Sequence, residues 1–249
     1  MGELHKENLQ EDQYHFPYHH LAHITKDGFF TFKHLFWGLE HITYINFVID
    51  KINELEYKTL VDVGCGEGRI ISELENNKLA SYTGVDISSR ALHFARGFTN
   101  RADFFVHDIT RKPLEQKSDV IISCEVIEHI LPKKVDDYVR HISESIQNGG
   151  IFILTTPTTN VVTNGKHYQH FTHESLESHL NPYFEIEEVC YLNKKGLFGK
   201  ILERCLANRL FLLNTPKLNR SILNLYRSKV LIGNSETGSR IFIKCRKLI

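Results

Sequence analysis

The chain has 249 residues, of which 41% are hydrophobic and 24% charged, so it is long and apolar enough to bury a core of its own. Thirty basic and thirty acidic residues leave no formal net charge, which gives no whole-chain reason to expect a nucleic-acid partner. Five scattered cysteines without a CxxC pair, a polar N-terminus and the lack of a long apolar run together predict a cytoplasmic protein without a disulfide framework or structural zinc.

Residues 1–56 predict an N-terminal cap followed by a helix that packs on the main domain. The cap sequence HFPYHHLAHITKDGFF is rich in histidine and aromatic residues. We expect a lid that faces the substrate, because aromatic side chains exclude water and stack on rings. Its histidines could reach an active site, although surface or packing roles are the main alternative; they are His15, His19, His20 and His23.

A glycine-rich loop follows the first strand of the main domain. Residues 59–69 read TLVDVGCGEGR, with glycines at 64, 66 and 68 and helix-like sequence after them. Glycines let the backbone turn tightly and approach a ligand, and the following helix offers unpaired N–H groups. Arg69 stands where a dinucleotide fingerprint has its third glycine, and no Gly-Lys-Ser/Thr of a P-loop is present. The loop therefore predicts a nucleotide-like cofactor, while both phosphate-binding motifs are incomplete.

Strand-like and helix-like stretches alternate beyond the loop, and several strands are nearly continuous apolar runs. The predicted strands are 59–64, 81–88, 102–109, 119–123, 151–157, 183–193 and 239–249, and the predicted helices between them are 69–77, 89–98 and 135–147. The last of these helices is expected to stop at Gly149–Gly150. This alternation predicts an α/β fold with a largely parallel sheet covered on both faces.

In such a sheet, ligands bind at the carboxyl ends of the strands. Asp86 ends the second strand, where a carboxylate can accept both hydroxyls of a ribose. Asp108 ends the third strand and could accept from an adenine amino group, with Ile109 packed on the ring. Asp62, just before the glycine loop, is expected either to hold the loop or to meet an ammonium group.

Four pieces together resemble the class I S-adenosylmethionine-dependent methyltransferases: VDVGCGEG, GVDIS, HDI and DVIISCEVIEHI, in this order and spacing. The resemblance covers roughly residues 57–192, with residues 239–247 as the last strand of that fold. It implies a Rossmann-like, doubly wound, seven-stranded sheet that is mostly parallel with an antiparallel last strand. The methyltransferase domain would then be residues 57–249.

The resemblance implies S-adenosylmethionine as the cofactor. The glycines would pack against its methionine and ribose portions, while Asp86 holds the ribose and Asp108 the adenine. The implied cofactor-binding residues are Asp62, Gly64, Cys65, Gly66, Gly68, Asp86, Ile87, Asp108, Ile109 and Cys124. The alternatives are a non-catalytic domain that kept the fold, or a binder of another nucleotide.

Methyl transfer from a sulfonium requires an aligned nucleophile, exclusion of water and a place for the nucleophile's proton. Glu125, Glu128 and His129 stand at i, i+3 and i+4 after the fourth strand, which predicts one helical face with two carboxylates and an imidazole. Such a set can hold Mg²⁺ or another divalent cation, which would lower a hydroxyl's pKa. The pattern is similar to that of ubiquinone-type O-methyltransferases and small-RNA 3′-end 2′-O-methyltransferases, where it binds a divalent metal.

The RNA enzymes of that resemblance carry a further histidine after the fifth strand. Here GKHYQHFTHESL offers His167 and His170, with His173 expected as the first residue of a helix. The predicted metal ligands are Glu125, Glu128, His129 and His167, and the predicted catalytic residues are these four with His170. The alternative is a metal-free site in which His129, His167 or His170 acts as the general base.

An insertion between the last two strands, residues 194–229, is strongly basic. Nine lysines and arginines against Glu203 give it a net charge of +8, and leucine, isoleucine and phenylalanine interleave with them. Asn214–Pro216 predicts a turn between two helices. Such sequence suits an anionic membrane surface, a phosphorylated lipid-linked substrate or RNA. A packed helical subdomain with a solvated basic face is the alternative.

These observations support three functional hypotheses. The first is an O-methyltransferase acting on a small molecule or glycan hydroxyl, cytoplasmic or peripheral at the membrane. The second is an RNA 2′-O-methyltransferase, although no recognisable RNA-binding module accompanies the motifs. The third is a membrane-associated binding protein with a vestigial site.

Overall fold

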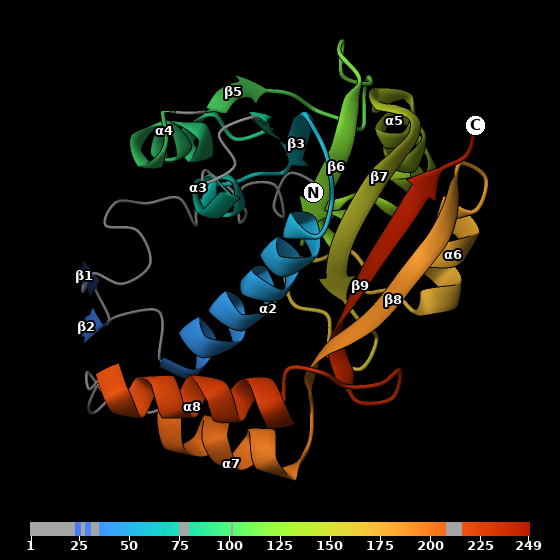
Figure 1. The fold of residues 1–249 in the computed structure, drawn as a ribbon. Helices are drawn as coiled ribbons and strands as arrows, with labels where there is room; N and C mark the ends of the chain where they lie inside the picture. Colours follow the sequence, from blue (N-terminus) through green and yellow to red (C-terminus); the bar gives the residue numbers. More distant parts are fainter. Residues whose placement is uncertain (1–22, 26–27, 31–34, 75–79, 101, 208–215) are drawn as a thin grey trace.

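A computed structural model describes residues 23–25, 28–30, 35–74, 80–100, 102–207 and 216–249 (Figure 1). Its main strands are β3 (Thr59–Val63), β4 (Ser81–Asp86), β5 (Ala102–Val106), β6 (Ser118–Cys124), β7 (Ile146–Pro157), β8 (Phe184–Lys194) and β9 (Gly238–Lys247). They form one seven-stranded sheet in the order β5-β4-β3-β6-β7-β9-β8. Among these strands, β9 alone runs opposite to the other six, so the predicted α/β Rossmann-like fold is confirmed.

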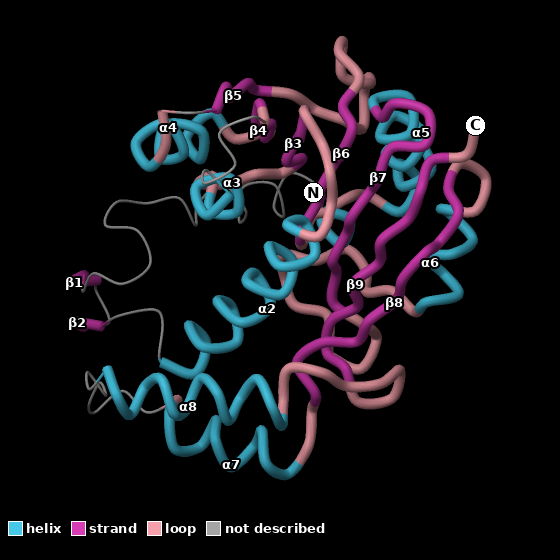
Figure 2. Tube along the Cα trace, viewed as in Figure 1, coloured by secondary structure: helices cyan, strands magenta, loops and turns pink. Residues whose placement is uncertain are grey.

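Helices cover both faces of this sheet (Figure 2). The described α-helices are α2 (Leu35–Asn53), α3 (Arg69–Leu74), α4 (Ser89–Phe98), α5 (Val135–Ser145), α6 (His173–Leu180), α7 (Leu197–Leu206) and α8 (Pro216–Lys229). Because successive strand side chains point to opposite faces, Leu60 packs with Val48 of α2 in one core, whereas Val61 packs with Val139 of α5 in the other. Thus α2, α3 and α4 cover one face, and α5 and α6 cover the other.

Strand order places the expected ligand crevice at the centre of the sheet. From β3 the chain moves outward to β4 and β5, then returns to the other side of β3 as β6 and continues to β7. The carboxyl ends of β3 and β6 therefore flank a topological switch point, where open α/β sheets bind their ligands.

One predicted boundary is wrong. The helix expected to reach Gly149–Gly150 ends at Ser145, and β7 begins at the next residue, where Ile146 pairs with Ser118 of β6. Gly149 has a φ of 74° and lies where the β6–β7 register shifts. Backbone pairing with β6 thus ends the helix earlier than the glycines would.

The insertion forms two helices, α7 and α8, which lie side by side next to α2 at one end of the molecule (Figure 1). Phe36 and Leu39 of α2 pack there with Leu206 and Tyr226. The predicted turn at residues 214–216 lies outside the described residues except for the first residue of α8.

Little of the N-terminal cap is described. His15, His19 and His20 lie outside the described residues, and His23 begins β1 (His23–Thr25), which pairs with β2 (Gly28–Phe30) apart from the main sheet. No helix in the described ranges is both long and apolar enough to cross a membrane.

Candidate active site

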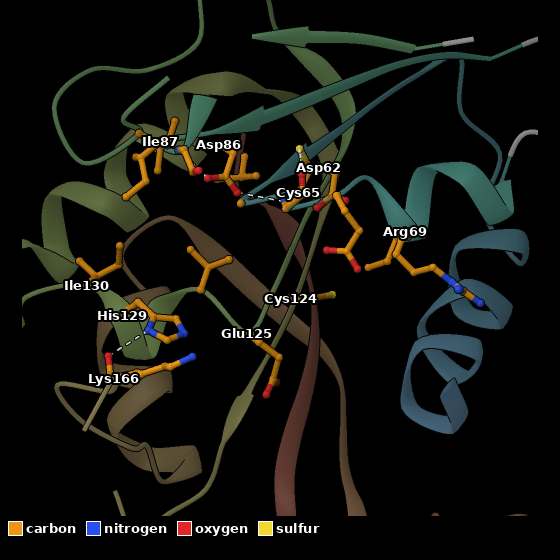
Figure 3. A pocket seen from close by; sticks show the side chains of 18 of the residues that line it. Asp62, Cys65, Arg69, Asp86, Ile87, Cys124, Glu125, His129, Ile130 and Lys166 are labelled. Carbon is orange, nitrogen blue, oxygen red and sulfur yellow. Dashed lines mark hydrogen bonds between the residues drawn. The ribbon is translucent and has the colours of Figure 1, made fainter. Parts of the chain in front are cut away.

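A cavity of about 480 Å³ opens at the carboxyl ends of β3, β4 and β6 (Figure 3). This volume suits a ligand of nucleoside size or larger. The predicted site residues that line it are Asp62, Gly64, Cys65, Gly66, Asp86, Ile87, Asp108, Ile109, Cys124, Glu125, His129 and His167. Figure 3 shows Asp62 and Asp86 along one side and Glu125 and His129 along the other. We call these the cofactor side and the acceptor side.

The glycine loop follows β3 on the cofactor side. Gly64 and Gly66 have φ values of 75° and 53°, in the left-handed region that side chains disfavour. A Cβ on Gly64 would lie 2.3 Å from Cγ2 of Val126, so no larger residue fits there. The N–H of Gly66 donates to Oδ2 of Asp86 at 2.9 Å. Asp86 therefore holds the loop, a role that the sequence had left open for Asp62.

Gly68 does not share this role. A Cβ there would lie 3.1 Å from Cβ of Ala95 and 3.2 Å from the ring of Phe104, and Gly68 does not line the cavity. That Gly68 packs against the cofactor therefore stays a prediction. Gly68 allows the start of α3 to approach α4 and β5.

Asp86 is oriented from two directions. Its Oδ2 accepts from the loop and its Oδ1 accepts from the N–H of Ser88 at 2.8 Å. Ser88 is also the N-cap of α4, where its hydroxyl accepts from the N–H of Ala91. A carboxylate accepts about four hydrogen bonds, so ribose hydroxyls can share this one. Ile87, beside it, is 63% exposed on the cavity wall and offers an apolar surface.

Asp108 lies at the end of β5 in a loop that it organises itself. Its Oδ1 accepts from the N–H and the hydroxyl of Thr110, and its Oδ2 is 2.9 Å from Nε of Arg111. Ile109 is buried on the cavity wall. The adenine roles of both residues remain predictions.

Asp62 is a buried carboxyl at the end of β3. It is 2% exposed, and no group of the described chain donates a hydrogen bond to it. Burial, with the charge of Asp86 added, raises the pKa of Asp62 to about 8. A buried carboxyl that lines a cavity without a partner fits the alternative in which it meets an ammonium group of a ligand.

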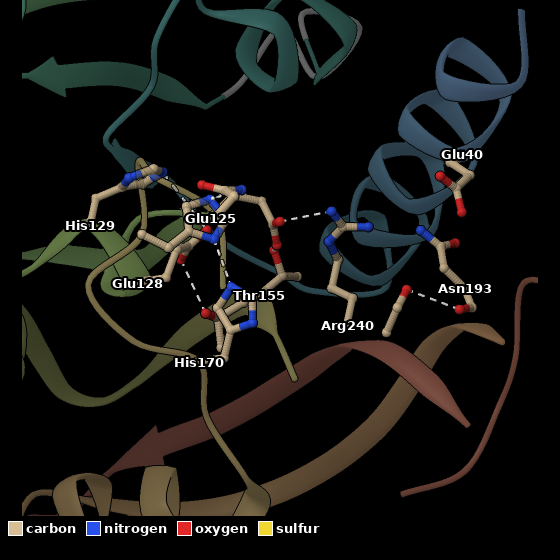
Figure 4. A network of polar contacts seen from close by, with 12 residues as sticks. Glu40, Glu125, Glu128, His129, Thr155, His170, Asn193 and Arg240 are labelled. Atoms are coloured by element: carbon tan, nitrogen blue, oxygen red, sulfur yellow. Dashed lines mark hydrogen bonds and ion pairs between the residues drawn. The ribbon is translucent and has the colours of Figure 1, made fainter. Parts of the chain in front are cut away.

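On the acceptor side, the backbone conformation of Glu125 shows that the predicted helical face is wrong. Its φ is 59°, and only residues 127–129 form a helical turn, a 3₁₀ helix. Its carboxylate accepts from Nη2 of Arg240 at 2.8 Å and from the hydroxyl of Thr155 at 3.0 Å (Figure 4). Arg240 in turn lies over the ring of Tyr44, at 4.1 Å from its centroid. Burial alone would raise the pKa of Glu125, but Arg240 outweighs it and holds that pKa below its ordinary value.

Glu128, His129 and His167 come together, and their ligand-type atoms lie within 4.8 Å of one another. Glu125 is not part of this group, because its carboxylate is engaged by Arg240. The structure thus brings together three of the four predicted metal ligands, and metal binding by them stays a prediction.

Within this three-residue cluster, Glu128 is fully buried and is not one of the residues that line the cavity. Its Oε2 accepts from the hydroxyl of Thr156 at 3.0 Å, while its Oε1 has no hydrogen-bond partner among the described residues. That oxygen lies 4.0 Å from Nε2 of His129, whose Nδ1–H donates to the carbonyl of Lys166. Burial, with the charge of Glu125, raises the pKa of Glu128 well above its ordinary value.

His170 stands behind His167 rather than in the cavity, so its predicted catalytic role becomes one of positioning. Its Nδ1–H donates to the carbonyl of Val161, and its Nε2 accepts from Nδ1–H of His167 at 2.7 Å. We infer from these bonds that Nε2 is the acceptor nitrogen of His167. Burial, with neighbouring His129 and His170, lowers the pKa of His167 to about 4, so its imidazole is neutral at neutral pH.

Several cavity residues were not predicted from the sequence. They are Trp37, His41 and Tyr44 of α2, Lys166 and Arg240. Arg240 pairs with Pro157, so the start of β9 lies beside the end of β7. The first residues of an antiparallel strand lie at the edge where its parallel neighbours end, so the topology places the start of β9 at the site without singling out Arg240.

The seven-stranded sheet, the glycine loop and the acidic strand ends define the Rossmann-like methyltransferase class. Residues 61–154 match the family model described as a methyltransferase domain. This match covers less than half of the chain and supports a class I S-adenosylmethionine-dependent methyltransferase.

Known proteins agree with this assignment. The chain is 27% identical over 172 residues to putative methyltransferase 235L of Invertebrate iridescent virus 6, covering 65% of this chain and 63% of that protein. It is 30% identical over 140 residues to the ubiquinone biosynthesis O-methyltransferase of Rickettsia typhi, covering 53% of this chain and 54% of that protein. The match thus spans less than two thirds of each of these relatives.

Among solved structures, the N-methyltransferase NodS of Bradyrhizobium japonicum has the same fold, with a TM-score of 0.57 at 12% identity over 84% of this chain and 87% of that one. Magnesium protoporphyrin IX methyltransferase of Synechocystis gives 0.55 at 14% identity, over 84% of each chain.

Proposed function

We propose that this protein transfers a methyl group from S-adenosylmethionine to a hydroxyl of a small molecule or glycan, and that Glu128, His129 and His167 hold a divalent cation at the acceptor. The observation that carries the proposal is the buried Oε1 of Glu128, which has no hydrogen-bond partner among the described residues and lies 4.0 Å from Nε2 of His129, a residue that lines the cavity. A buried oxygen without a partner is costly unless it serves a ligand.

The cofactor side fits S-adenosylmethionine, which would supply an electrophilic methyl group. Asp86 would accept from the ribose hydroxyls, and Ile87 would offer its exposed side chain to the adenine. Asp62 would meet the methionine ammonium, which relieves the cost of a buried carboxyl. Gly64 leaves the backbone open where any Cβ would collide with Val126.

The acceptor side fits a divalent cation. One carboxylate oxygen and two imidazole nitrogens are a mixed donor set that suits ions such as Mn²⁺ as well as Mg²⁺. A bound cation would lower the pKa of an acceptor hydroxyl and orient it. The chain's own residues would fix that geometry, because Lys166 and His170 orient the two imidazoles through hydrogen bonds. In the metal-free alternative, His129 takes the proton itself.

The choice of oxygen as the atom that accepts the methyl group is argued from the similar proteins and not from the site. The printed name of the Rickettsia typhi relative favours oxygen, whereas NodS is an N-methyltransferase. RNA is the second candidate, because His167 joins the cluster from the segment after β7, as the resemblance to the small-RNA enzymes implies. The basic insertion favours an anionic partner of either kind.

The test combines binding with turnover. We expect S-adenosylhomocysteine to bind by calorimetry and Mn²⁺ to bind by electron paramagnetic resonance. Methyl transfer is then assayed on phenols, sugars, amines and short RNAs, with and without EDTA. Glu128→Gln and His167→Gln should abolish Mn²⁺ binding, whereas His179→Gln, at a surface ion pair with Asp136, should not.

Two results would overturn the proposal. If the chain does not bind S-adenosylhomocysteine, the methyltransferase proposal is wrong and the non-catalytic hypothesis stands. If Glu128→Gln binds Mn²⁺ as tightly as the native chain, Glu128 is not a metal ligand. Transfer to amines alone, or only to the 2′-hydroxyl of RNA, would replace the acceptor class.

A further inference from the structure

Helix α7 turns an apolar face toward solvent. Leu197 is 77% exposed, Ile201 53% and Phe198 39%. Positions i, i+1 and i+4 of a helix lie on one side, within about 100° of arc. The opposite side carries Gly199 and Leu206, which are buried. Both sides of α7 therefore carry apolar residues, whereas the outward side of a surface helix in an isolated globular protein is usually polar.

Helix α8 adds to the same end of the molecule. Leu218 and Leu225 are exposed and lie two turns apart, on one side of that helix. Its buried side is anchored by Tyr226, which packs with Phe36 and Leu39 of α2. The exposed leucines are therefore not required for holding α8 on the domain.

Basic side chains surround these apolar positions. The exposed basic residues of the described part of the insertion are Lys194, Lys195, Lys200, Arg204, Lys217, Arg220, Arg227 and Lys229, and its one acidic residue is Glu203. Because the whole chain is neutral, the rest of the protein carries a net charge of −8 against the insertion's +8. The positive charge is thus concentrated where the exposed apolar side chains lie.

We propose that α7 and α8 dock on the surface of an anionic lipid bilayer. Leu197, Phe198 and Ile201 would enter the boundary between headgroups and acyl chains, while the lysines and arginines contact lipid phosphates. The combination of charges and exposed aliphatic side chains favours a bilayer over RNA, because RNA offers phosphates and stackable bases but no apolar phase. This docking surface contains none of the residues that line the cavity, so the proposal does not depend on the chemistry proposed there.

The test is co-sedimentation of the full chain with phosphatidylcholine vesicles, with and without phosphatidylglycerol. We expect binding only when phosphatidylglycerol is present, and weaker binding as salt rises. The double variant Leu197→Ser/Ile201→Ser should bind at least about tenfold more weakly, since it loses two apolar side chains to insert. Phe98→Ser, which removes an exposed apolar side chain from α4, is the matched control and should bind like the native chain.

A second pair of variants tests the charges. Lys200→Glu/Arg204→Glu should lower affinity for phosphatidylglycerol vesicles by about tenfold or more. Lys112→Glu/Lys117→Glu changes the net charge equally in the loop before β6 and should have a much smaller effect. Circular dichroism confirms that each variant is folded.

Three outcomes would overturn docking on a bilayer. The first is that the chain binds none of the vesicles. The second is that Leu197→Ser/Ile201→Ser binds vesicles as tightly as the native chain. The third is that the chain shifts RNA in a gel but does not bind vesicles.

Discussion

The two sides of the cavity are assembled in different ways. The cofactor side comes from one continuous part of the chain, between Asp62 and Ile109, at the ends of three neighbouring strands. The acceptor side brings together residues that are far apart in sequence: His129 after β6, His167 after β7 and Arg240 at the start of β9. Local backbone geometry therefore shapes the first side, whereas tertiary packing shapes the second.

The two sides also differ in the groups that satisfy their carboxylates. On the cofactor side, backbone N–H groups of Gly66 and Ser88 satisfy Asp86. On the acceptor side, side chains rather than backbone groups satisfy Glu125, namely Arg240 and the hydroxyl of Thr155, and Glu128 keeps an oxygen without a hydrogen-bond partner among the described residues. A buried carboxyl with an oxygen that lacks a hydrogen-bond donor is costly and is retained where it serves a function, and within the described part of the chain each side keeps one, Asp62 on the cofactor side and Glu128 on the acceptor side.

Gly64→Ala should break the cofactor side with the largest effect. The added Cβ would lie 2.3 Å from Val126, at a φ of 75° that disfavours alanine. We expect a loss of about 3 kcal/mol in the free energy of unfolding, and affinity for S-adenosylhomocysteine reduced by about 100-fold. Urea denaturation and calorimetry measure both. Gly97→Ala, in α4 with open space around its Cβ, should leave affinity unchanged; native-like binding by Gly64→Ala would contradict the account.

Arg240→Met should break the acceptor side through stability. The variant leaves the Glu125 side chain, which is 20% exposed, with the hydroxyl of Thr155 as its remaining hydrogen-bond partner among the described residues, so we expect the free energy of unfolding to fall by about 2 kcal/mol. Arg246→Met, at the more exposed pair with Glu187, should cost less than about 1 kcal/mol. Combining Arg240→Met with Glu125→Gln should recover part of the loss, and strictly additive effects would show that the two residues are not coupled.

The difference between the two sides explains what could be predicted from the sequence. The glycine loop and the acidic strand ends could be predicted because each is a local pattern whose position follows from strand order. The i, i+3, i+4 spacing of Glu125, Glu128 and His129 wrongly predicted that the three residues share one face of a helix. The N–H of Glu125 bonds to the carbonyl of Thr155 at 2.9 Å, which extends the β6–β7 pairing and prevents a helix from starting there.

Arg240 could not be singled out in the same way. In the sequence it is one basic residue of an alternating strand, and its partner Glu125 lies 115 residues away. Only the position of β9 between β7 and β8 brings the two together. A contact between residues so far apart in the sequence depends on the order of all the strands in the sheet, so no local sequence pattern encodes it.

His170→Ala sharpens the acceptor side with a smaller effect. Without its acceptor nitrogen, the ring of His167 is no longer oriented, so we expect Mn²⁺ affinity to fall by about tenfold. His170→Asn keeps an acceptor oxygen and should restore part of the affinity, while S-adenosylhomocysteine binding stays unchanged in both. Equal Mn²⁺ affinity in the native chain and His170→Ala would show that this hydrogen bond has no positioning role.

The raised pKa of Asp62 predicts a modest effect of pH on ligand binding at the cofactor side. With a pKa of about 8, Asp62 holds a proton at neutral pH, and an ammonium group beside it favours the ionised form. Ligand binding should therefore release up to one proton, and affinity should rise with pH until the pH passes this pKa.

The same shift lowers the stability of the ligand-free protein as pH rises from the ordinary carboxyl pKa toward 8, because the folded state binds the extra proton. Calorimetry in buffers of different ionisation enthalpy counts the released protons. Asp62→Asn should abolish the release, and a release that persists in this variant would assign it to another group.

The central claim is that the two sides of the cavity have separable roles, and one calorimetric comparison tests it most directly. S-adenosylhomocysteine is titrated into the native chain, Asp86→Ala and Glu128→Gln. We predict that Asp86→Ala loses affinity by at least about tenfold, whereas Glu128→Gln binds within about twofold of the native chain. Equal loss of affinity in the two variants would contradict the claim, because Glu128 would then belong to the cofactor site.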